Sequence, residues 1–362
     1  MPTRFLLGLA ASLLLLASGC KEPDGASGGT SGAALYAYDS SSSVVFVWSD
    51  LSALYDGTAT SVAPTKQISS SVFTSKIASL AWGGLCFDAQ KGFLYLVSET
   101  GDIVRVNNIR SQSGVVATSD VVSFSLANAG RLASSTFGQA ALDAQNDRLF
   151  ITENGTSGTQ IWVVNNASSQ FQSASIALQA LQMTGDTGGT GVAASAGSVY
   201  AFMLDGNTVG TVIAYSGPRL RKGTSSAFTD ANTIIGPSTL FGKYGSLTLD
   251  TGNGYLFVAR HIVDAGGVST APIQVFTTGM FGQAHDQAPI ATLGSATDQT
   301  NLRVIAHAGT KDWLVGLKGT GTTASGSIYI WKSPMGGTAA KTINASPITS
   351  LFKGLAVDGN AS

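Results

Sequence analysis

Beyond residue 33, short apolar runs alternate with turn-forming residues along the whole chain. Typical runs are "GLCFD", "FLYLV", "DIVRV" and "QIWVV", with Gly, Asn, Asp and Ser clustered between them. Runs of this length that are rich in β-branched and aromatic residues predict β-strands, and the residues between them predict tight turns. No helical period of useful length accompanies these runs. The pattern therefore predicts an all-β protein.

A unit of three such strands repeats along the chain. In each strong copy the first strand ends in Asp, a turn rich in Gly, Asn and Gln follows, and a polar loop separates the second and third strands. The anchoring residues are Asp88, Asp143, Asp250 and Asp358, with Ala194 and His307 at the same place in two weaker copies. Successive anchors lie 51 to 57 residues apart. With a looser fourth strand, each copy has the composition of a propeller blade, whereas an open β-solenoid has shorter repeats.

The two ends of the chain complement each other. The last residues include "GLAVD" (Gly354 to Asp358), which matches the first strand of the repeat but has no second strand after it. The segment from Ala34 to Leu51 matches the second and third strands without a first. We therefore predict a six-bladed β-propeller over residues 34–362, in which the C-terminal strand joins the N-terminal blade and closes the ring.

The repeat has the form "GLxxD…LYVxxxxxxxIxV" and resembles the NHL-like and YVTN-like β-propellers, and more distantly the gluconolactonase-like group. The resemblance covers nearly all of the chain after the tether. It implies the fold well and the function poorly, because these families include binding modules, scaffolds and hydrolases.

The N-terminus is typical of an export signal. One charge, Arg4, precedes the apolar run "FLLGLAASLLLLASGC", which is short for a membrane span and ends in small residues. "LASGC" resembles a bacterial lipobox, although Ala17 stands where Leu is usual. The resemblance implies a signal peptide over residues 1–19, cleavage before Cys20 and lipidation of Cys20; an ordinary secretory signal is the alternative. Lys21 follows the Cys, and by resemblance to lipoprotein sorting rules it favours an outer membrane over the inner one.

Composition narrows the possible partners. Residues 20–33 form a Gly/Ser-rich tether. The net charge is −1, so no basic footprint for nucleic acid exists. Of the two cysteines, Cys20 is the expected lipid anchor, which leaves Cys86 without a disulfide partner in the mature chain. We expect a monomeric propeller that is held on a membrane through Cys20 and binds an unidentified protein or small ligand on one face.

Aromatic residues recur six positions before the strong anchors: Trp82, Phe137, Tyr244 and Phe352. By resemblance to propeller blades, this place lies at one mouth of the central channel. There the rings would stack against a flat ligand. Alternatively, each ring wedges between adjacent blades and has a structural role. The anchor aspartates themselves are expected to cap turns. Three longer segments, Thr152–Gln160, Arg260–Pro272 and Lys318–Ser327, are expected to be loops that set specificity.

No catalytic motif is evident, since a nucleophile elbow, a phosphate-binding loop and closely spaced histidines are all missing. Gluconolactonase-like enzymes hold a divalent metal in the channel, and the nearest candidates for such ligands are Glu99, Glu153 and Asn154. The sequence therefore favours a non-catalytic, lipid-anchored binding module at the cell envelope with no cofactor. A Ca²⁺- or other metal-dependent hydrolase or lactonase, and a purely structural envelope scaffold, remain alternatives.

Overall fold

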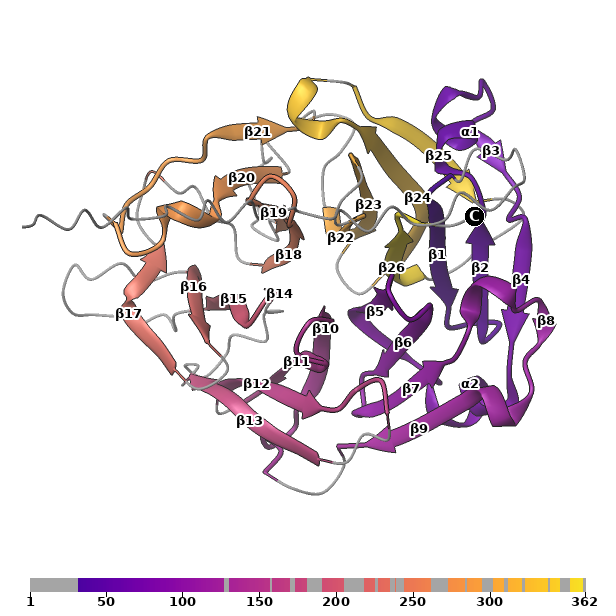
Figure 1. Cartoon of the computed structure of the whole chain (residues 1–362), viewed down its shortest axis with the longest axis horizontal. Helices are drawn as coiled ribbons and strands as arrows, with labels where there is room; N and C mark the ends of the chain where they lie inside the picture. The colour runs from indigo at the N-terminus through magenta and orange to yellow at the C-terminus, as the bar shows by residue number, and fades with distance from the viewer. Residues whose placement is uncertain are drawn as a thin grey trace, which may run out of the picture. The chain divides into compact units, whose positions relative to one another are not determined.

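The computed structural model describes residues 32–126, 130–156, 158–169, 173–180, 191–204, 218–224, 227–234, 238, 244–261, 273–283, 285–294, 302–308, 312–320, 323–337, 339–345 and 352–360. All of them fall within one unit, Ser31–Ser362. Six sheets make up this unit and lie in a ring (Figure 1), and their innermost strands line a central channel. The protein is a six-bladed β-propeller, as the repeat predicted.

Blade 1 combines the two ends of the chain. Its strands, from the channel outwards, are β26 (Phe352–Asp358), β1 (Ala34–Asp39), β2 (Val44–Trp48) and β4 (Lys66–Ser69). β26 pairs antiparallel with β1, with Ala37 opposite Leu355 and Tyr36 opposite Ala356. The predicted closure of the ring by the C-terminal strand is confirmed.

The other five blades each use one continuous segment, in chain order from the channel outwards. Blade 2 contains β5 (Leu80–Asp88), β6 (Phe93–Ser98), β7 (Asp102–Val106) and β9 (Val121–Ser125); blade 3 contains β10 (Thr136–Asp143), β11 (Arg148–Gly155), β12 (Gly158–Asn165) and β13 (Ser173–Ala180). Blade 4 contains β14 (Gly191–Ser195), β15 (Ser198–Leu204), β16 (Pro218–Thr224) and β17 (Ala227–Ile234). Blade 5 contains β18 (Tyr244–Asp250), β19 (Tyr255–His261), β20 (Ile273–Thr277) and β21 (Ala291–Leu293); blade 6 contains β22 (Leu302–His307), β23 (Trp313–Thr320), β24 (Thr323–Lys332) and β25 (Lys341–Ala345). Every predicted anchor lies at or next to the end of an innermost strand.

The strands are apolar on both faces because each blade packs between two others. All six residues of β1 are buried. Leu35 and Ala37 pack with side chains of blade 6, whereas Tyr36 and Tyr38 pack with blade 2. Successive side chains of a strand point to opposite faces of the sheet. The near-continuous hydrophobic runs in the sequence therefore supply two inter-blade cores at once.

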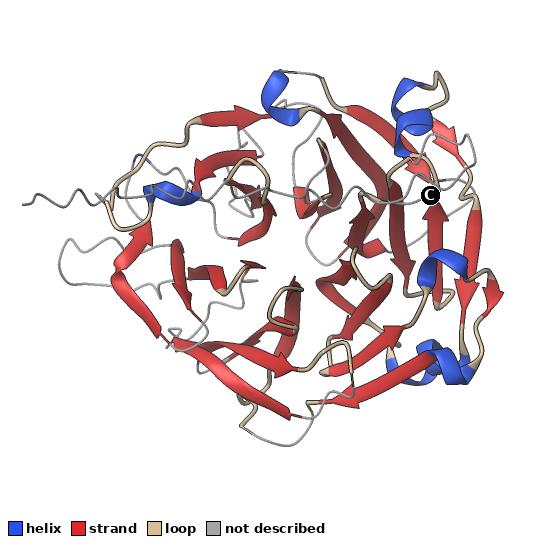
Figure 2. Cartoon of the chain, viewed as in Figure 1, coloured by secondary structure: helices blue, strands red, loops and turns tan. Residues whose placement is uncertain are grey.

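The pairing of β26 with β1 is the closing seam of the ring. Short strands at the outer edges also join blade 1 to its neighbours. β3 (Ser61–Val62) adds a parallel strand to the outer edge of blade 6, and β8 (Gly114–Val115) does the same for blade 1. The helices lie in the connections around the ring of strands (Figure 2): α1 (Leu51–Asp56), α2 (Ser71–Lys76) and the 3₁₀ turns η1 (Ile109–Ser111), η2 (Thr118–Asp120), η4 (Thr278–Met280) and η5 (Pro334–Gly336). No helix within the described ranges is long and apolar enough to cross a membrane.

Two of the expected specificity loops are strands instead. β11 and β12 continue to Gly155 and from Gly158, and Asn154 pairs with Thr159 near the end of the hairpin. β23 and β24 likewise pair out to Thr320 and Thr323. In both hairpins the Thr- and Gly-rich segment continues the ladder of backbone hydrogen bonds beyond the core. The third segment, Arg260–Pro272, lies outside the described residues after His261.

Candidate functional site

At the end of the channel where the innermost strands begin, the β6–β7 loop lies beside the first residues of β5 and β10. The backbone N–H of Glu99 donates to the carbonyl of Ser79 at 2.9 Å, just before β5. The N–H of Phe137, at the start of β10, donates to the carbonyl of Glu99 at 3.1 Å. These bonds place the beginnings of two inner strands and the loop between them on one face. We call this end of the channel the mouth.

Trp82 is the most accessible of the predicted rim aromatics whose side chains the structure describes. It lies half-buried in β5 and packs against the core between blades 1 and 6. The guanidinium carbon of Arg303, in β22, lies 3.9 Å from the centre of the indole ring. The ammonium of Lys353, in β26, lies 6.0 Å from it. Cations at these distances are attracted by the ring quadrupole. Blades 6, 1 and 2 thus meet at one aromatic side chain.

Lys353 is also held by a small polar network. Its Nζ donates to Glu99 Oε1 at 2.7 Å and to Ser79 Oγ at 2.9 Å. Ser79 Oγ in turn donates to Glu99 Oε2 at 2.6 Å. The side chains of Lys353 and Glu99 are 15% and 30% exposed, so the ion pair lies at the surface of the mouth.

The other rim aromatics differ from Trp82. Phe352 is fully buried and packs edge-on against Phe46 and Trp48. Phe137 is 3% exposed, and its ring occupies the space that a side chain at Gly101 would need, since a Cβ there would lie 2.5 Å from it. These two rings pack between blades, so neither is open to a ligand in this structure. Tyr244 begins β18, and its side chain lies outside the described part of the chain.

Glu153, a candidate metal ligand, is a buried structural carboxylate. Its Oε1 accepts from Arg131 Nε, from the Leu132 N–H and from the Ser135 hydroxyl, and its Oε2 accepts from Gln160 Nε2 and Trp162 Nε1. These five donors hold the segment before β10 against blade 3. A metal at Glu153 would have to displace them.

The remaining candidate ligands are also engaged by protein groups. Asn154 Oδ1 accepts from the Thr159 hydroxyl at 3.1 Å, and Glu99 binds Lys353. Within the ranges that the structure describes, no three His, Cys, Asp or Glu side chains form a cluster that could hold a metal ion. Glu99 and Glu153 both lie near the mouth, but the described donors around them are those of ion pairs and hydrogen bonds within the protein.

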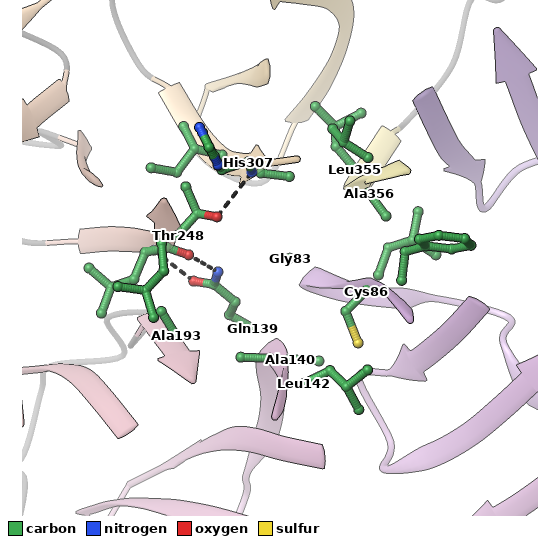
Figure 3. Close-up of a pocket in the computed structure, with 18 of the residues that line it drawn as sticks. Gly83, Cys86, Gln139, Ala140, Leu142, Ala193, Thr248, His307, Leu355 and Ala356 are labelled. Carbon is green, nitrogen blue, oxygen red and sulfur yellow. Dashed lines mark hydrogen bonds between the residues drawn. The ribbon is translucent and has the colours of Figure 1, made fainter. Parts of the chain in front are cut away.

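The channel itself encloses a cavity of about 210 Å³ lined by the six innermost strands (Figure 3). Gln139 of β10 reaches across it: its Nε2 donates to the Leu247 carbonyl at 2.6 Å, and its Oε1 accepts from the N–H groups of Leu247 and Val192. Gly191 permits the close approach of blades 4 and 5 beside Gln139, because a Cβ there would lie 2.4 Å from the Gly245 carbonyl oxygen and 3.0 Å from Gln139 Oε1. Gln139 therefore pairs with strand edges that face the channel, and ties blade 3 to blades 4 and 5.

Two titratable groups also line the cavity. His307 stacks on Phe257, with ring centres 5.5 Å apart, and burial lowers its pKa although the charges of Asp250 and Asp312 act in the opposite direction. Burial raises the pKa of the Cys86 thiol, with a smaller contribution from Asp88. Cys86 is free, and its protonated thiol fits the inert core role expected from its place in an apolar strand.

The anchor aspartates lie at the opposite end of the channel and cap the turns that follow the inner strands. Asp88 accepts from the N–H groups of Gln90 and Lys91, and Asp250 from those of Gly252 and Asn253. This is the expected Asx-turn role. Asp358 adds a contact between blades, because both its oxygens accept from Arg110 of blade 2, at 2.5 and 2.8 Å. The aspartates are structural residues.

Sequence reasoning did not single out Gln139, Arg303 or Lys353. Arg303 and Lys353 are the second residues of β22 and β26, so the repeat places them near the mouth. A basic residue at the beginning of an innermost strand was the signal that could have found them. Gln139 carries no comparable signal, because its partners belong to blades 4 and 5.

Comparisons with known proteins identify the fold and no family. No family model matches the sequence, and no curated protein does. Among solved structures, a chain titled "Crystal structure of Nidogen/Laminin Complex" matches with a TM-score of 0.53 at 12% identity, over 91% of this chain and 100% of that one. A chain of a mitotic checkpoint complex gives 0.41 at 12% identity, over 75% of this chain and 68% of that one. A Kuenenia stuttgartiensis hydrazine synthase chain gives 0.43 at 9%, over 76% and 69%. Only the first TM-score is above 0.5, and at 12% identity this similarity concerns the fold alone.

Proposed function

We propose that this chain is an exported, lipid-anchored β-propeller that binds a partner protein at the mouth of its channel and catalyses no reaction. The observation that carries the binding role is the half-buried Trp82 ring, with Arg303 and Lys353 placed against it. Tryptophan and arginine are enriched among the residues that dominate protein–protein binding. The rigid ring brings these side chains together from three blades.

The sequence supports the membrane location. A lipobox-like "LASGC" ends at Cys20, and a Gly/Ser-rich tether separates it from the first strand of the propeller. Acyl chains on Cys20 would hold the domain at a membrane surface, and Lys21 favours the outer membrane. Incorporation of labelled palmitate into the wild-type chain but not into Cys20→Ala tests the anchor, and equal incorporation would refute it.

A protein partner is favoured over a metal-dependent reaction. Glu153 already accepts five hydrogen bonds from protein donors, and Glu99 is paired with Lys353. The chain from the nidogen/laminin complex is an example of this fold in a protein–protein assembly. A melting temperature that rises with Ca²⁺ and no longer does so in Glu99→Gln would instead favour the hydrolase.

The experiment compares proteins that co-purify with the tagged full chain from detergent-solubilised envelopes. We expect a near-stoichiometric partner with the wild type, its loss with Trp82→Ala and with Arg303→Gln, and its retention with Gln90→Ala, an exposed residue at the other end of the channel. Melting curves verify that each variant is folded. Absence of a partner, or retention in both mouth variants, would leave the structural scaffold as the better description.

A further inference from the structure

The ion pair between Lys353 and Glu99 lies next to the aromatic surface of the mouth. Lys353 contacts three groups: the Trp82 ring at 6.0 Å, Ser79 Oγ at 2.9 Å and Glu99 Oε1 at 2.7 Å. Glu99 belongs to the β6–β7 loop and is the more exposed partner, at 30%. The mouth therefore already holds one carboxylate on a cation that lies near an aromatic ring, and this carboxylate comes from the chain itself.

The contacts around Glu99 describe what the mouth can bind. Its two oxygens accept from an ammonium and a hydroxyl, and the guanidinium of Arg303 lies on the neighbouring indole ring. An arginine guanidinium both stacks on aromatic faces and pairs with carboxylates, so it adds positive charge beside Lys353 at this surface. Glu99 is the more exposed member of this partly buried pair, and another carboxylate in its place on Lys353 would restore the ion pair that the mouth already holds.

We propose that the mouth binds an acidic segment of the partner protein, whose Asp or Glu carboxylate replaces that of Glu99 on Lys353 beside the Arg303–Trp82 stack. This inference rests on the proposed function and gives its partner a chemistry. Glu99 then acts as a built-in competitor: it holds Lys353 in place in the free protein and lowers the affinity for the partner.

A protein segment suits this surface better than a small anion. The channel cavity is lined by neither Trp82 nor Arg303 nor Lys353, so these side chains lie outside the enclosed space. Small-molecule sites enclose most of their ligand. A surface formed by Trp, Arg and Lys from three blades instead matches the central residues of a protein interface.

The test measures binding of fluorescent hexaglutamate to the full chain in detergent, by anisotropy at low and high salt. Glu99→Gln removes the competing charge and should tighten binding by about fivefold, which corresponds to about 1 kcal/mol. Lys353→Met and Arg303→Gln should weaken it, and high salt should weaken it in every variant. Hexaglutamine should not bind.

The matched control is Asp102→Asn. It removes one negative charge from the start of β7, three residues from Glu99, where Asp102 Oδ1 lies 4.0 Å from Lys76 Nζ. Asp102→Asn should therefore change the affinity much less than Glu99→Gln. Equal effects of the two variants would overturn the exchange, as would equal binding of hexaglutamine. Binding of the acidic oligosaccharide trigalacturonate without binding of hexaglutamate would also overturn it, because the carboxylate would then belong to a sugar and not to a protein segment.

The two proposals can fail separately. If a protein co-purifies in a Trp82-dependent way but no variant binds hexaglutamate, the mouth recognises its partner by other chemistry and only this inference falls. If Glu99→Gln binds hexaglutamate as expected while no protein co-purifies with the wild type, the carboxylate site stands and the proposed function falls.

Discussion

Phe352 provides a quantitative test of ring closure, because it lies on the C-terminal strand and is fully buried. Its ring packs against Phe46 at 6.1 Å and Trp48 at 6.4 Å, both on the N-terminal strand β2. Phe352→Ala should therefore lower the free energy of unfolding by about 3–5 kcal/mol. Since folded proteins are stable by only about 5–15 kcal/mol, this loss should affect the whole domain.

Removal of the whole strand should cost more. Besides Phe352, β26 buries Leu355 and Val357, and full burial of each such side chain contributes about 1.5–3 kcal/mol. Loss of the strand also leaves Arg110 without Asp358 and exposes the inner edge of β1. Truncation after Leu351 should therefore leave little or no folded protein at 25 °C.

Urea unfolding of the full chain, followed by tryptophan fluorescence and circular dichroism, measures both effects. The control is Phe124→Ala, because Phe124 is a half-buried ring on β9, the outer strand of blade 2, away from the seam. It should cost less than half as much as Phe352→Ala. If Phe352→Ala cost no more than Phe124→Ala, or if the truncated chain melted like the full one, closure by β26 would not hold the ring together.

Two further predictions concern the channel. Gln139→Leu leaves the Leu247 and Val192 backbone groups without their side-chain partner and should lower the unfolding free energy by about 2–4 kcal/mol, while the exposed Gln90→Leu should have little effect; equal stabilities in urea would contradict the bridging role of Gln139. Because the pKa of His307 is lowered in the folded protein, the unfolded chain takes up a proton at higher pH than the native one. The contribution of His307 to the free energy of unfolding should therefore be complete above about pH 7. It should fall with acidification below the unfolded pKa of about 6.5, by up to about 1.4 kcal/mol per pH unit, and His307→Gln should remove that part of the pH dependence. An unchanged slope in the variant would assign the pH dependence to other groups.

The repeat in the sequence correctly predicted the features that depend on the order of residues along the chain. The number of blades, the closing strand and the turn-capping role of Asp88 and Asp250 all follow from the spacing of the repeats in the sequence. The helix α1 was not predicted, because six residues are too few for a helical period. Its formation depends on Asp50 as N-cap and on burial of Leu51 and Leu54.

The exposure of the rim aromatics could not be predicted from the repeat. Trp82, Phe137 and Phe352 occupy the same place in the repeat, yet Phe352 is enclosed by Phe46 and Trp48 whereas Trp82 meets Arg303 and Lys353. Exposure at this place is decided by the neighbouring blades, and the repeat does not encode it. The prediction of an aromatic rim for binding therefore stays open for Trp82, while the Phe rings are parts of the inter-blade core.

The candidate binding surface and the closing seam share one strand. Lys353 belongs to β26, between Arg303 of blade 6 and Trp82 of blade 2. In an open ring Lys353 would no longer lie beside Trp82 and Ser79, so a partner that binds these groups together binds the closed ring in preference. Such a ligand stabilises the closed state by about 2.7 kcal/mol at one hundred times its dissociation constant. A partner bound at this surface would thus stabilise the pairing of the two chain ends. Its binding would have the largest effect at the closing seam.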